Sequence, residues 1–246
     1  MKNSLALLLL APCLAAAQAP AAKPRVAVVI DDFGLNYKKT PPDEEWQKAN
    51  IPLTWAVMPE SPRTAKAAAA AVEGKAELII HFPFDPFISG LKLPKEAADP
   101  EDVKKVAALL AQAFKQIPGP VGLNNHRSYR ATQNAPLMAA FMKLYKPKGL
   151  YFLDSKVAPK TKAYAEAKAA GVPAALNWIF LDTAELHTQD FCAKMLEQAV
   201  AHARKTGEAV VIGHHYFRTT LDCVNEEGPR HAADGVEFVH ASALAR

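Results

Sequence analysis

Arg25-Val-Ala-Val-Val-Ile30 is a short apolar run rich in β-branched residues, and two adjacent carboxylates, Asp31-Asp32, follow it directly. Continuous apolar runs of this kind are typical of strands that are buried on both faces, as in a parallel sheet. A dinucleotide-binding fold would need a glycine-rich loop after such a first strand, and residues 31–37 do not contain one. The stretch therefore predicts the first strand of an α/β fold, with acidic side chains at its carboxyl end.

Similar apolar runs recur along the chain and alternate with helical patterns. Further strands are predicted over residues 52–58, 77–82, 121–123, 149–153, 174–181, 209–212 and 235–239. Helices are predicted between them, over residues 62–73, 100–116, 134–144, 160–170 and 188–205. About seven or eight strand–helix units, without a break in composition inside residues 24–246, predict one α/β domain that is closed or nearly closed into a barrel.

The N-terminus has the three parts of a secretory signal peptide. Lys2 is followed by an apolar run at residues 5–10 and then by small residues that end in A-Q-A at 17–19. The run is too short for a membrane anchor, which needs roughly 20 apolar residues. A lipoprotein signal at Cys13 is disfavoured because Pro12 stands where a small residue is needed. We expect cleavage near Ala19, a periplasmic or secreted protein, and no stable membrane insertion.

The composition is that of an ordinary globular chain. Half of the 246 residues are hydrophobic and 22% are charged, which excludes wholesale disorder. A formal net charge of +4 without a basic stripe argues against nucleic acid as a partner. Three cysteines cannot build a disulfide framework, although an oxidising compartment would permit Cys192 and Cys223 to pair. Because Cys192 also fits a helical pattern with apolar neighbours, a disulfide and a buried thiol are both open.

Polar side chains follow most of the predicted strands. In parallel α/β folds the chemistry lies at the carboxyl ends of the strands. Six of the apolar runs are followed by residues that suit metal binding or acid–base chemistry, namely Asp31-Asp32, His81, Asn124-Asn125-His126, Asp154-Ser155, Asp182 and His214-His215. Each residue is unremarkable alone, but six such endings are unusual for a mere scaffold. The sequence therefore predicts a polar site at one end of the barrel.

Asp32, His81 and His126 form a set of two histidines and one carboxylate. Such a set with open coordination positions suits Zn²⁺ or another divalent first-row ion. The adjacent carboxylates Asp31 and Asp32 repel each other, and a divalent cation would offset that repulsion. One of them can then bind the metal while its neighbour acts as a base. The alternative for this pair is that both residues only cap the turn after the strand.

Six short motifs occur in a fixed order along the chain. They are I-D-D-F-G at 30–34, H-F-P-F-D-P at 81–86, G-L-N-N-H at 122–126, F-L-D-S at 152–155, F-L-D at 180–182 and I-G-H at 212–214. In these motifs and in their order, the chain resembles the divergent polysaccharide deacetylase family. The resemblance implies a NodB-like glycoside hydrolase/deacetylase fold, a distorted (β/α) barrel of about seven units, over residues 24–246, with residues 1–19 as the signal peptide.

The resemblance also implies a metal-dependent deacetylase site. Asp31 would be the general base, and His214 would be the acid that protonates the leaving amine. Asp32, His81 and His126 would bind the metal, which is most simply Zn²⁺. Four further residues would support these groups or contact the substrate, namely Asn125, Asp154, Asp182 and His215.

The implied activity is hydrolysis of a carbon–nitrogen amide bond, with removal of N-acetyl groups from a polysaccharide or from the glycan of peptidoglycan. Three segments depart from the family pattern. The usual N-N-H-M-G-S-R is N-N-H-R-S-Y-R at 124–130, the usual Arg-Asp is Asn177-Trp178, and the usual G-H-P-H is G-H-H-Y at 213–216. Two alternatives stay open: a catalytically decayed envelope protein that binds glycan or a protein partner, and a hydrolase of the peptide part of peptidoglycan.

Overall fold

The computed structural model describes residues 22–85 and 97–246 of the chain. The predicted signal peptide and Cys13 lie outside these ranges, as does Pro86 at the end of its motif. Within the described ranges, no helix is long and apolar enough to cross a membrane. All of the strands and helices predicted from the sequence lie within the described ranges.

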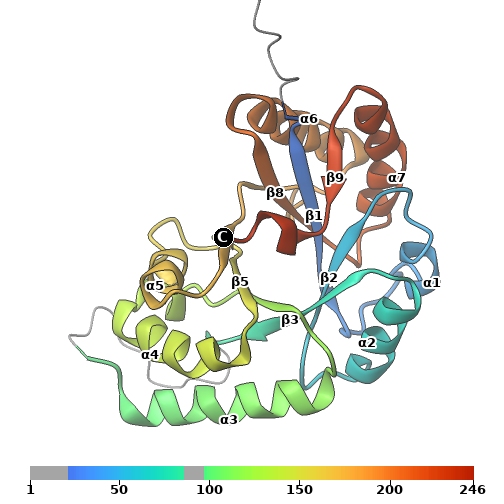
Figure 1. The fold of residues 1–246 in the computed structure, drawn as a ribbon. Helices are drawn as coiled ribbons and strands as arrows, with labels where there is room; N and C mark the ends of the chain where they lie inside the picture. Colours follow the sequence, from blue (N-terminus) through green and yellow to red (C-terminus); the bar gives the residue numbers. More distant parts are fainter. Residues whose placement is uncertain (1–21, 86–96) are drawn as a thin grey trace, which may run out of the picture.

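One parallel sheet of nine strands curls through the molecule, and the helices lie around it (Figure 1). The strands are β1 (Arg25–Phe33), β2 (Leu53–Val57), β3 (Glu77–Pro83), β4 (Gly122–His126), β5 (Tyr151–Asp154), β6 (Ala174–Leu176), β7 (Ile179–Phe180), β8 (Glu208–His214) and β9 (Glu237–Val239). Neighbouring strands follow the order β6-β5-β4-β3-β2-β1-β8-β7, and β9 pairs with the start of β1. The predicted α/β architecture with a nearly closed parallel sheet is confirmed.

The helices are α1 (Asp43–Trp46), α2 (Thr64–Glu73), α3 (Pro100–Gln116), α4 (Ala135–Tyr145), α5 (Ala163–Ala170), α6 (Gln189–Thr206) and α7 (Arg218–Ala233), with short 3₁₀ turns at Ala131–Gln133, Lys146–Lys148 and Ala241–Leu244. Five of the seven helices in the described ranges, α2 to α6, lie where the sequence predicts helices, whereas α1 and α7 were not predicted. Side chains of Asp99, Asn134 and Thr188 cap α3, α4 and α6, because each accepts a hydrogen bond from a backbone N–H of the first turn.

The predicted strand over residues 174–181 is divided into β6 and β7, which end the sheet on opposite sides. The backbone N–H of Asn177 donates to the carbonyl of Asp154, the last residue of β5, whereas that of Trp178 donates to the Val210 carbonyl on β8. The chain thus changes its hydrogen-bonding partner between two consecutive residues. Asn177 and Trp178 therefore join the two ends of the curled sheet, and the prediction of a single strand was wrong.

Helix α7 is absent from the sequence-based prediction, because Gly228 and Pro229 lie inside it. Proline cannot donate to the carbonyl four residues earlier, which belongs to Asn225. That carbonyl instead accepts a hydrogen bond from the Asn50 side chain, at 3.3 Å. Gly228 lies against Ile51, where a Cβ atom would approach the Ile51 side chain to 2.8 Å. Tertiary contacts thus stabilise a helix that local propensity disfavours.

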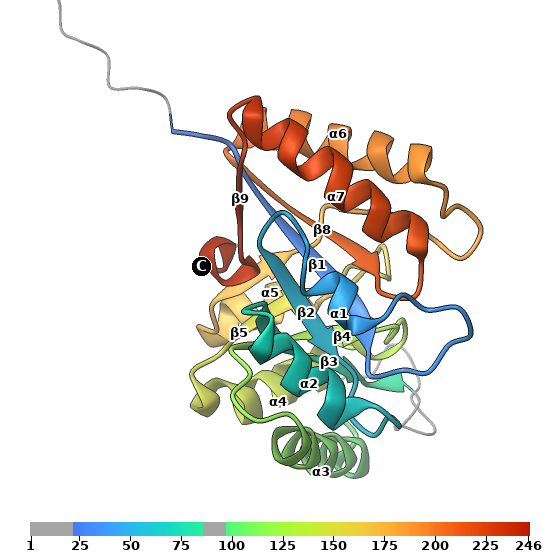
Figure 2. The ribbon, with the colours of Figure 1, turned by 90° about the vertical axis from the view of Figure 1, so that its right-hand side faces the viewer.

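Helices α6 and α7 lie side by side over β1 and β8 (Figure 2). A disulfide between Cys192 and Cys223 joins them, with the two Cα atoms 6.2 Å apart. Both cysteines are fully buried in the apolar layer between these helices and the sheet. Of the two interpretations that the sequence left open, the structure contains the disulfide.

Strand alternation divides the core into two clusters. The larger cluster lies between the sheet and the surrounding helices, and it includes Phe33 stacked on Trp55 with ring centroids 4.0 Å apart. The smaller cluster fills the inside of the barrel, and we call it the interior cluster. Its buried members are Ala27, Val29, Ala56, Ile79, Tyr151, Leu153, Ala175, Val210, Ile212, Ala241 and Leu244. The interior cluster thus forms a floor beneath the carboxyl ends of the strands.

Candidate active site and metal centre

The inward direction of the site residues follows from the period of two along each strand. A member of the interior cluster lies two positions before Asp31 on β1, before His81 on β3 and before His214 on β8. In the sheet register Asp31 is the neighbour of His214, and His81 is the neighbour of Asn124. Four polar side chains therefore form the layer above the apolar floor.

Asp32 reaches the same interior by a different route. Strict alternation would direct it outward, but its φ of 70° lies in the left-handed region, and the pairing of β1 with β2 is irregular between Ile30 and Phe33. Bulges of this kind redirect side chains next to active sites. A non-glycine residue at positive φ is strained and persists only where surrounding contacts fix it. The irregularity allows consecutive aspartates to face one pocket.

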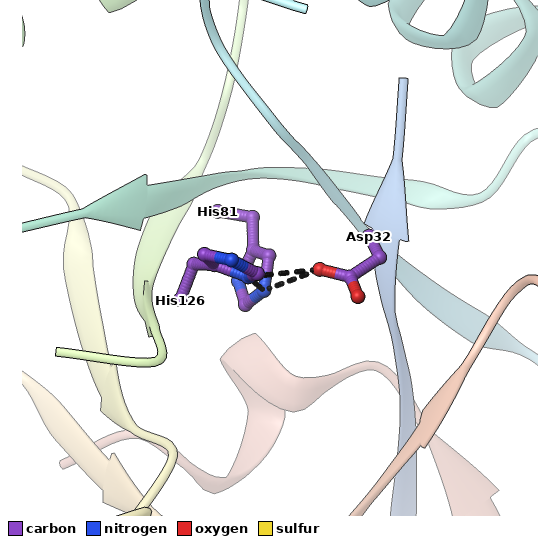
Figure 3. A group of neighbouring side chains, drawn as sticks. All are labelled: Asp32, His81 and His126. Atoms are coloured by element: carbon purple, nitrogen blue, oxygen red, sulfur yellow. Dashed lines mark hydrogen bonds and ion pairs between the residues drawn. The ribbon is translucent and has the colours of Figure 1, made fainter. Parts of the chain in front are cut away.

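Asp32, His81 and His126 converge as the sequence predicts (Figure 3). Asp32 Oδ1 lies 3.2 Å from His81 Nε2 and 2.9 Å from His126 Nδ1, and these two nitrogens are 2.9 Å apart. A triangle of this size allows one ion to reach all three atoms at roughly 2.0–2.2 Å, the usual ligand distances of Zn²⁺. These residues therefore form a candidate metal centre.

The unsatisfied carboxylate oxygen of Asp32 fits such an ion. Asp32 Oδ1 is buried and has no hydrogen-bond partner among the described residues, although both histidine nitrogens approach it. Burial alone would raise the pKa of Asp32, but the imidazoles of His126 and His81 hold it well below its usual range. A carboxylate that stays ionised while buried needs a cation, and the two histidines supply the remaining ligand atoms.

Asn124 is a functional residue that the sequence reasoning did not assign. Its Oδ1 accepts a hydrogen bond from His81 Nδ1 at 2.7 Å, and its Nδ2 donates to Asp31 Oδ1 at 2.8 Å. The first contact fixes the tautomer of His81, so that Nε2 presents its lone pair to the ligand triangle. The inward phase of β4, which places Asn124 between Gly122 and His126, is the sequence signal that could have identified it.

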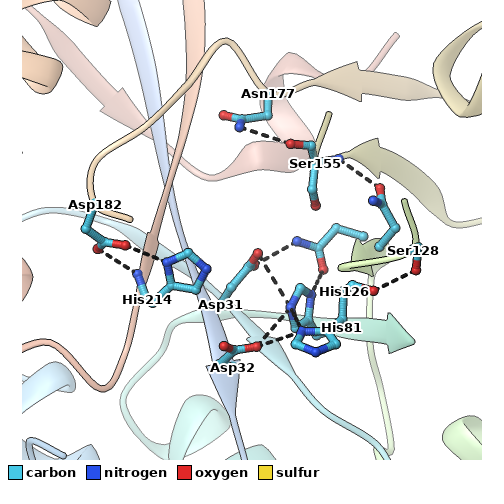
Figure 4. A network of polar contacts seen from close by, with 11 residues as sticks. Asp31, Asp32, His81, His126, Ser128, Ser155, Asn177, Asp182 and His214 are labelled. Carbon is cyan, nitrogen blue, oxygen red and sulfur yellow. Dashed lines mark hydrogen bonds and ion pairs between the residues drawn. The ribbon is translucent and has the colours of Figure 1, made fainter. Parts of the chain in front are cut away.

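His214 and Asp182 form an ion pair on the other side of Asp31 and Asp32 (Figure 4). His214 Nδ1 donates to Asp182 Oδ1 at 2.5 Å, and the second oxygen of Asp182 accepts from the His214 backbone N–H and from Thr220 Oγ1. Burial lowers the pKa of His214, but the Asp182 carboxylate outweighs it and raises the pKa to about 9. At neutral pH His214 is therefore an imidazolium with its Nε2 proton free for transfer.

Asp31 lies between these two groups. Its Oδ2 is 3.6 Å from His81 Nε2, and its carboxyl is 2% exposed. Burial raises the pKa of Asp31 above its usual value, against the opposing effect of the cationic rings of His81 and His214. A carboxylate with a raised pKa is a stronger base than one in water, which suits a proton acceptor.

A pocket of about 330 Å³ opens above these residues. Besides Asp31, Asp32, Asp182 and the three histidines of the site, its walls include Tyr37, Asn125, Arg127, Val157, Phe180, Thr183, Ala184 and Tyr216. Asn125 Oδ1 accepts from the Ser155 N–H at 2.9 Å, which joins the ends of β4 and β5. The predicted base, acid and ligands therefore share one cavity that is large enough for a sugar residue.

Two predicted supporting residues have other contacts than the resemblance implies. Asp154 accepts hydrogen bonds from Thr161 Oγ1 and from the backbone N–H groups of Lys156 and Tyr164, so it organises the loop after β5. His215 is fully buried outside the pocket, where its ring lies 4.9 Å from the ring of Phe33. Burial lowers the pKa of His215 to about 4, which keeps its ring neutral. Strand alternation explains why the His215 ring points away from the pocket, because His215 directly follows the inward-facing His214.

Comparisons with known proteins agree with the fold and motif order. A family model described as divergent polysaccharide deacetylase matches residues 28–245. The uncharacterized protein YibQ of Escherichia coli K12 is 31% identical over 209 residues, which cover 84% of this chain and 63% of YibQ. This chain therefore spans less than two thirds of the length of that relative.

Solved structures share the architecture at low sequence identity. The crystal structure of the uncharacterized protein ATU2773 from Agrobacterium tumefaciens matches with a TM-score of 0.78 and 21% identity, over 92% of this chain and 91% of that one. A family 4 carbohydrate esterase from Streptomyces lividans in complex with acetate matches with a TM-score of 0.56 and 14% identity, over 89% and 93%. These structures have the NodB-like fold in common with the curled sheet described above. Because the family model matches nearly the whole described region, the chain belongs to the divergent polysaccharide deacetylase family.

Proposed function

We propose that the protein is a metal-dependent hydrolase that removes N-acetyl groups from a glycan of the bacterial envelope. The observation that carries this proposal is the arrangement within one pocket, where Asp31 lies between the ligand triangle and the His214–Asp182 pair. Membership of the family and the likeness to an esterase crystallised with acetate support the same class of reaction. Acetate would also be a product of the reaction proposed here.

The reaction assigns one task to each group. A divalent metal ion, Zn²⁺ in this proposal, held by Asp32, His81 and His126 would supply positive charge that polarises the amide carbonyl and acidifies a water molecule. Asp31 takes a proton from that water as its oxygen bonds to the carbonyl carbon. His214 gives its Nε2 proton to the amide nitrogen as the carbon–nitrogen bond breaks. Acetate and the free amine of the sugar leave.

Asn124 favours an active enzyme over a catalytically decayed binding protein. The family's usual Arg-Asp pair is absent at Asn177-Trp178, and this loss supports the decayed alternative. However, Asn124 donates to Asp31 Oδ1 and accepts from His81 Nδ1, so the base and one ligand are both held in place. Asn177 donates instead to the Ser155 carbonyl, and Trp178 stacks on His202. The base therefore keeps a positioning partner, supplied by another strand.

The proposal places the protein in the periplasm or outside the cell. The Cys192–Cys223 disulfide supports an oxidising compartment, since such bonds are rare in reducing cytosol. The sequence of residues 1–19 suits removal by a signal peptidase, which would leave the deacetylase domain at residues 24–246. An extracytoplasmic location brings the pocket to the glycan of the envelope.

The decisive experiment measures metal content and acetate release together. The protein without residues 1–19 is purified, loaded with Zn²⁺, and incubated with N-acetylated glycan oligomers; the products are analysed by mass. We expect loss of one acetyl group per event, and we expect Asp31→Asn to abolish acetate release while it retains the metal. Binding of glycan without turnover would instead favour the decayed alternative. Cleavage products of a peptide would indicate a hydrolase of the peptide part of peptidoglycan.

A further inference from the structure

Arg127 is a positively charged residue in the wall of the pocket, and the reaction proposed above gives its charge no role. The other charged groups of the wall are offset within the site: His214 pairs with Asp182, and a divalent ion at the ligand triangle would offset Asp31 and Asp32. Arg127 forms no ion pair with any residue in the ranges 22–85 and 97–246. Its exposed side chain therefore adds a positive charge to the pocket wall that is open to a ligand.

The backbone holds Arg127 at a fixed place directly after the ligand His126. Arg127 and Ser128 have φ values of 49° and 61°, two consecutive non-glycine residues in the left-handed region. The buried Ser128 hydroxyl donates to the His126 carbonyl at 2.6 Å and accepts from the Phe84 N–H at 3.0 Å. Strained backbone persists only where such contacts fix it, and it clusters at ligand-binding sites. The backbone that carries Arg127 is thus anchored through the Ser128 hydroxyl.

Tyr37 and Tyr216 line the same pocket as Arg127. Their ring centroids are 4.6 Å apart, and Tyr37 is 42% exposed. Burial raises the pKa of both phenols, whereas the positive charge of Arg127 lowers it, so Arg127 is within electrostatic reach of both rings. Both phenols stay protonated at neutral pH, because burial and the nearby carboxylates raise their pKa above the ordinary value. Two protonated phenols and one guanidinium therefore line one pocket.

We propose that Arg127, Tyr37 and Tyr216 form an anion subsite, and that the substrate is an N-acetylated glycan with a carboxylate or phosphate group close to the acetamido group. A guanidinium binds either oxyanion with two parallel hydrogen bonds, and the phenols can donate further ones. The inference rests on the proposed function for the identity of the reacting amide, but it concerns only the recognition of a neighbouring group.

The test compares the binding of three tetrasaccharides that carry the same acetamido group. They are neutral chitotetraose, an analogue with lactyl carboxylates, as in N-acetylmuramic acid, and an analogue with 6-phosphates. Dissociation constants are measured by calorimetry on the Zn²⁺-loaded Asp31→Asn chain, which prevents turnover. We expect at least one anionic oligomer to bind roughly tenfold or more tightly than the neutral one. The preferred oligomer distinguishes a carboxylate from a phosphate, and added salt should weaken the preference.

Arg127→Met and Arg130→Met form a matched pair of variants. Arg130 is exposed on the same loop but does not line the pocket, so both variants remove one charge while only the first changes the subsite. We expect Arg127→Met to bind the three oligomers within about threefold of one another, because the charge-assisted hydrogen bonds are lost. Arg130→Met should keep the preference. An equal preference in both variants, or no preference in the parent, would overturn the anion subsite.

The outcomes separate this inference from the proposed function. Binding needs no turnover, so a preference that depends on Arg127 would support the subsite even if no acetate is released. Acetate release from the neutral oligomer without any anionic preference would support the hydrolase and overturn the subsite.

Discussion

Single side chains set the protonation states on which the site depends. Burial lowers the pKa of His81, but the carboxylates of Asp31 and Asp32 raise it above its usual value, so a metal ion at the triangle must compete with a proton. His126, in contrast, has a pKa lowered by burial, which leaves it neutral and ready to bind. Asp182 keeps His214 protonated. Histidine side chains therefore serve this site in two ways, as proposed metal ligands and as a proposed acid. The surroundings of each ring, and above all its carboxylate or amide partner, decide which.

Asp182→Asn should move the alkaline limit of activity. His214 must be protonated to act as the acid, so kcat/KM should fall as the pH rises through its pKa of about 9. Without the Asp182 carboxylate the pKa of His214 falls, and the alkaline limb should shift down by roughly 1–2 pH units. The pH–rate profile measures this shift. Asp222→Asn, which removes an exposed carboxylate of α7, is the control and should leave the limb in place.

Asn124→Ala should weaken metal binding. The variant leaves His81 without the acceptor that fixes its tautomer, and it leaves Asp31 Oδ1 without its donor. Loss of such supporting contacts lowers metal affinity by roughly 10- to 100-fold. Competition with a chelator of known affinity measures the change. Asn134→Ala removes another buried asparagine, the cap of α4, and should reduce stability without changing the affinity for metal.

A local irregularity in β1 and the strands around it position the site. The positive φ of Asp32 and the irregular pairing of β1 with β2 allow two consecutive carboxylates to face one pocket. Strands β3, β4 and β8 continue into His81, His126 and His214, so these side chains are held by a sheet rather than by loops. Sites on strands are held more precisely than sites on loops.

The disulfide between α6 and α7 should contribute measurably to stability. Its cysteines are 31 residues apart in sequence, and a cross-link over a loop of this length stabilises a protein by roughly 3–4 kcal/mol in the chain-entropy treatment. The double variant Cys192→Ala/Cys223→Ala should therefore unfold at lower denaturant concentration. Urea unfolding with and without reductant measures the difference. If reductant destabilised the double variant as much as the parent, the assignment to this bond would be refuted.

The whole barrel creates the candidate metal centre, because its three proposed ligands come from β1, β3 and β4. In the proposed function Zn²⁺ would bind the folded chain, and it would find no such arrangement in the unfolded one. At a concentration 100 times the dissociation constant it should add about 2.7 kcal/mol of stability, and therefore raise Tm by about 5–10 °C. Thermal unfolding with Zn²⁺ and with chelator measures this shift. Asp32→Asn has the same shape and tolerates the left-handed backbone, and it should lose most of the shift.

The fold followed from the sequence to the extent that local patterns carry it. Apolar runs separated by amphipathic helices are local features, so the alternation of strands and helices and the bounds of α3 were predicted. Helix α7 was not, because Asn50 and Ile51, more than 170 residues away, compensate for Pro229 and Gly228. The division at Asn177 depends on a change of partner strand, which no local pattern contains.

The sequence by itself determined which residue types follow six of the strands, and these indicated the family, the candidate metal ligands and the candidate base and acid. Only the tertiary structure decided which of these groups meet. It brought Asp31, the ligand triangle and the His214–Asp182 pair into one pocket, whereas Asp154 accepts hydrogen bonds from the segment after β5 and His215 is buried in the core. The tertiary structure also places Asn124 between His81 and Asp31, where it forms a hydrogen bond with each. The physical reason is that residue type and strand period are properties of the chain, whereas convergence depends on the register and curl of the sheet.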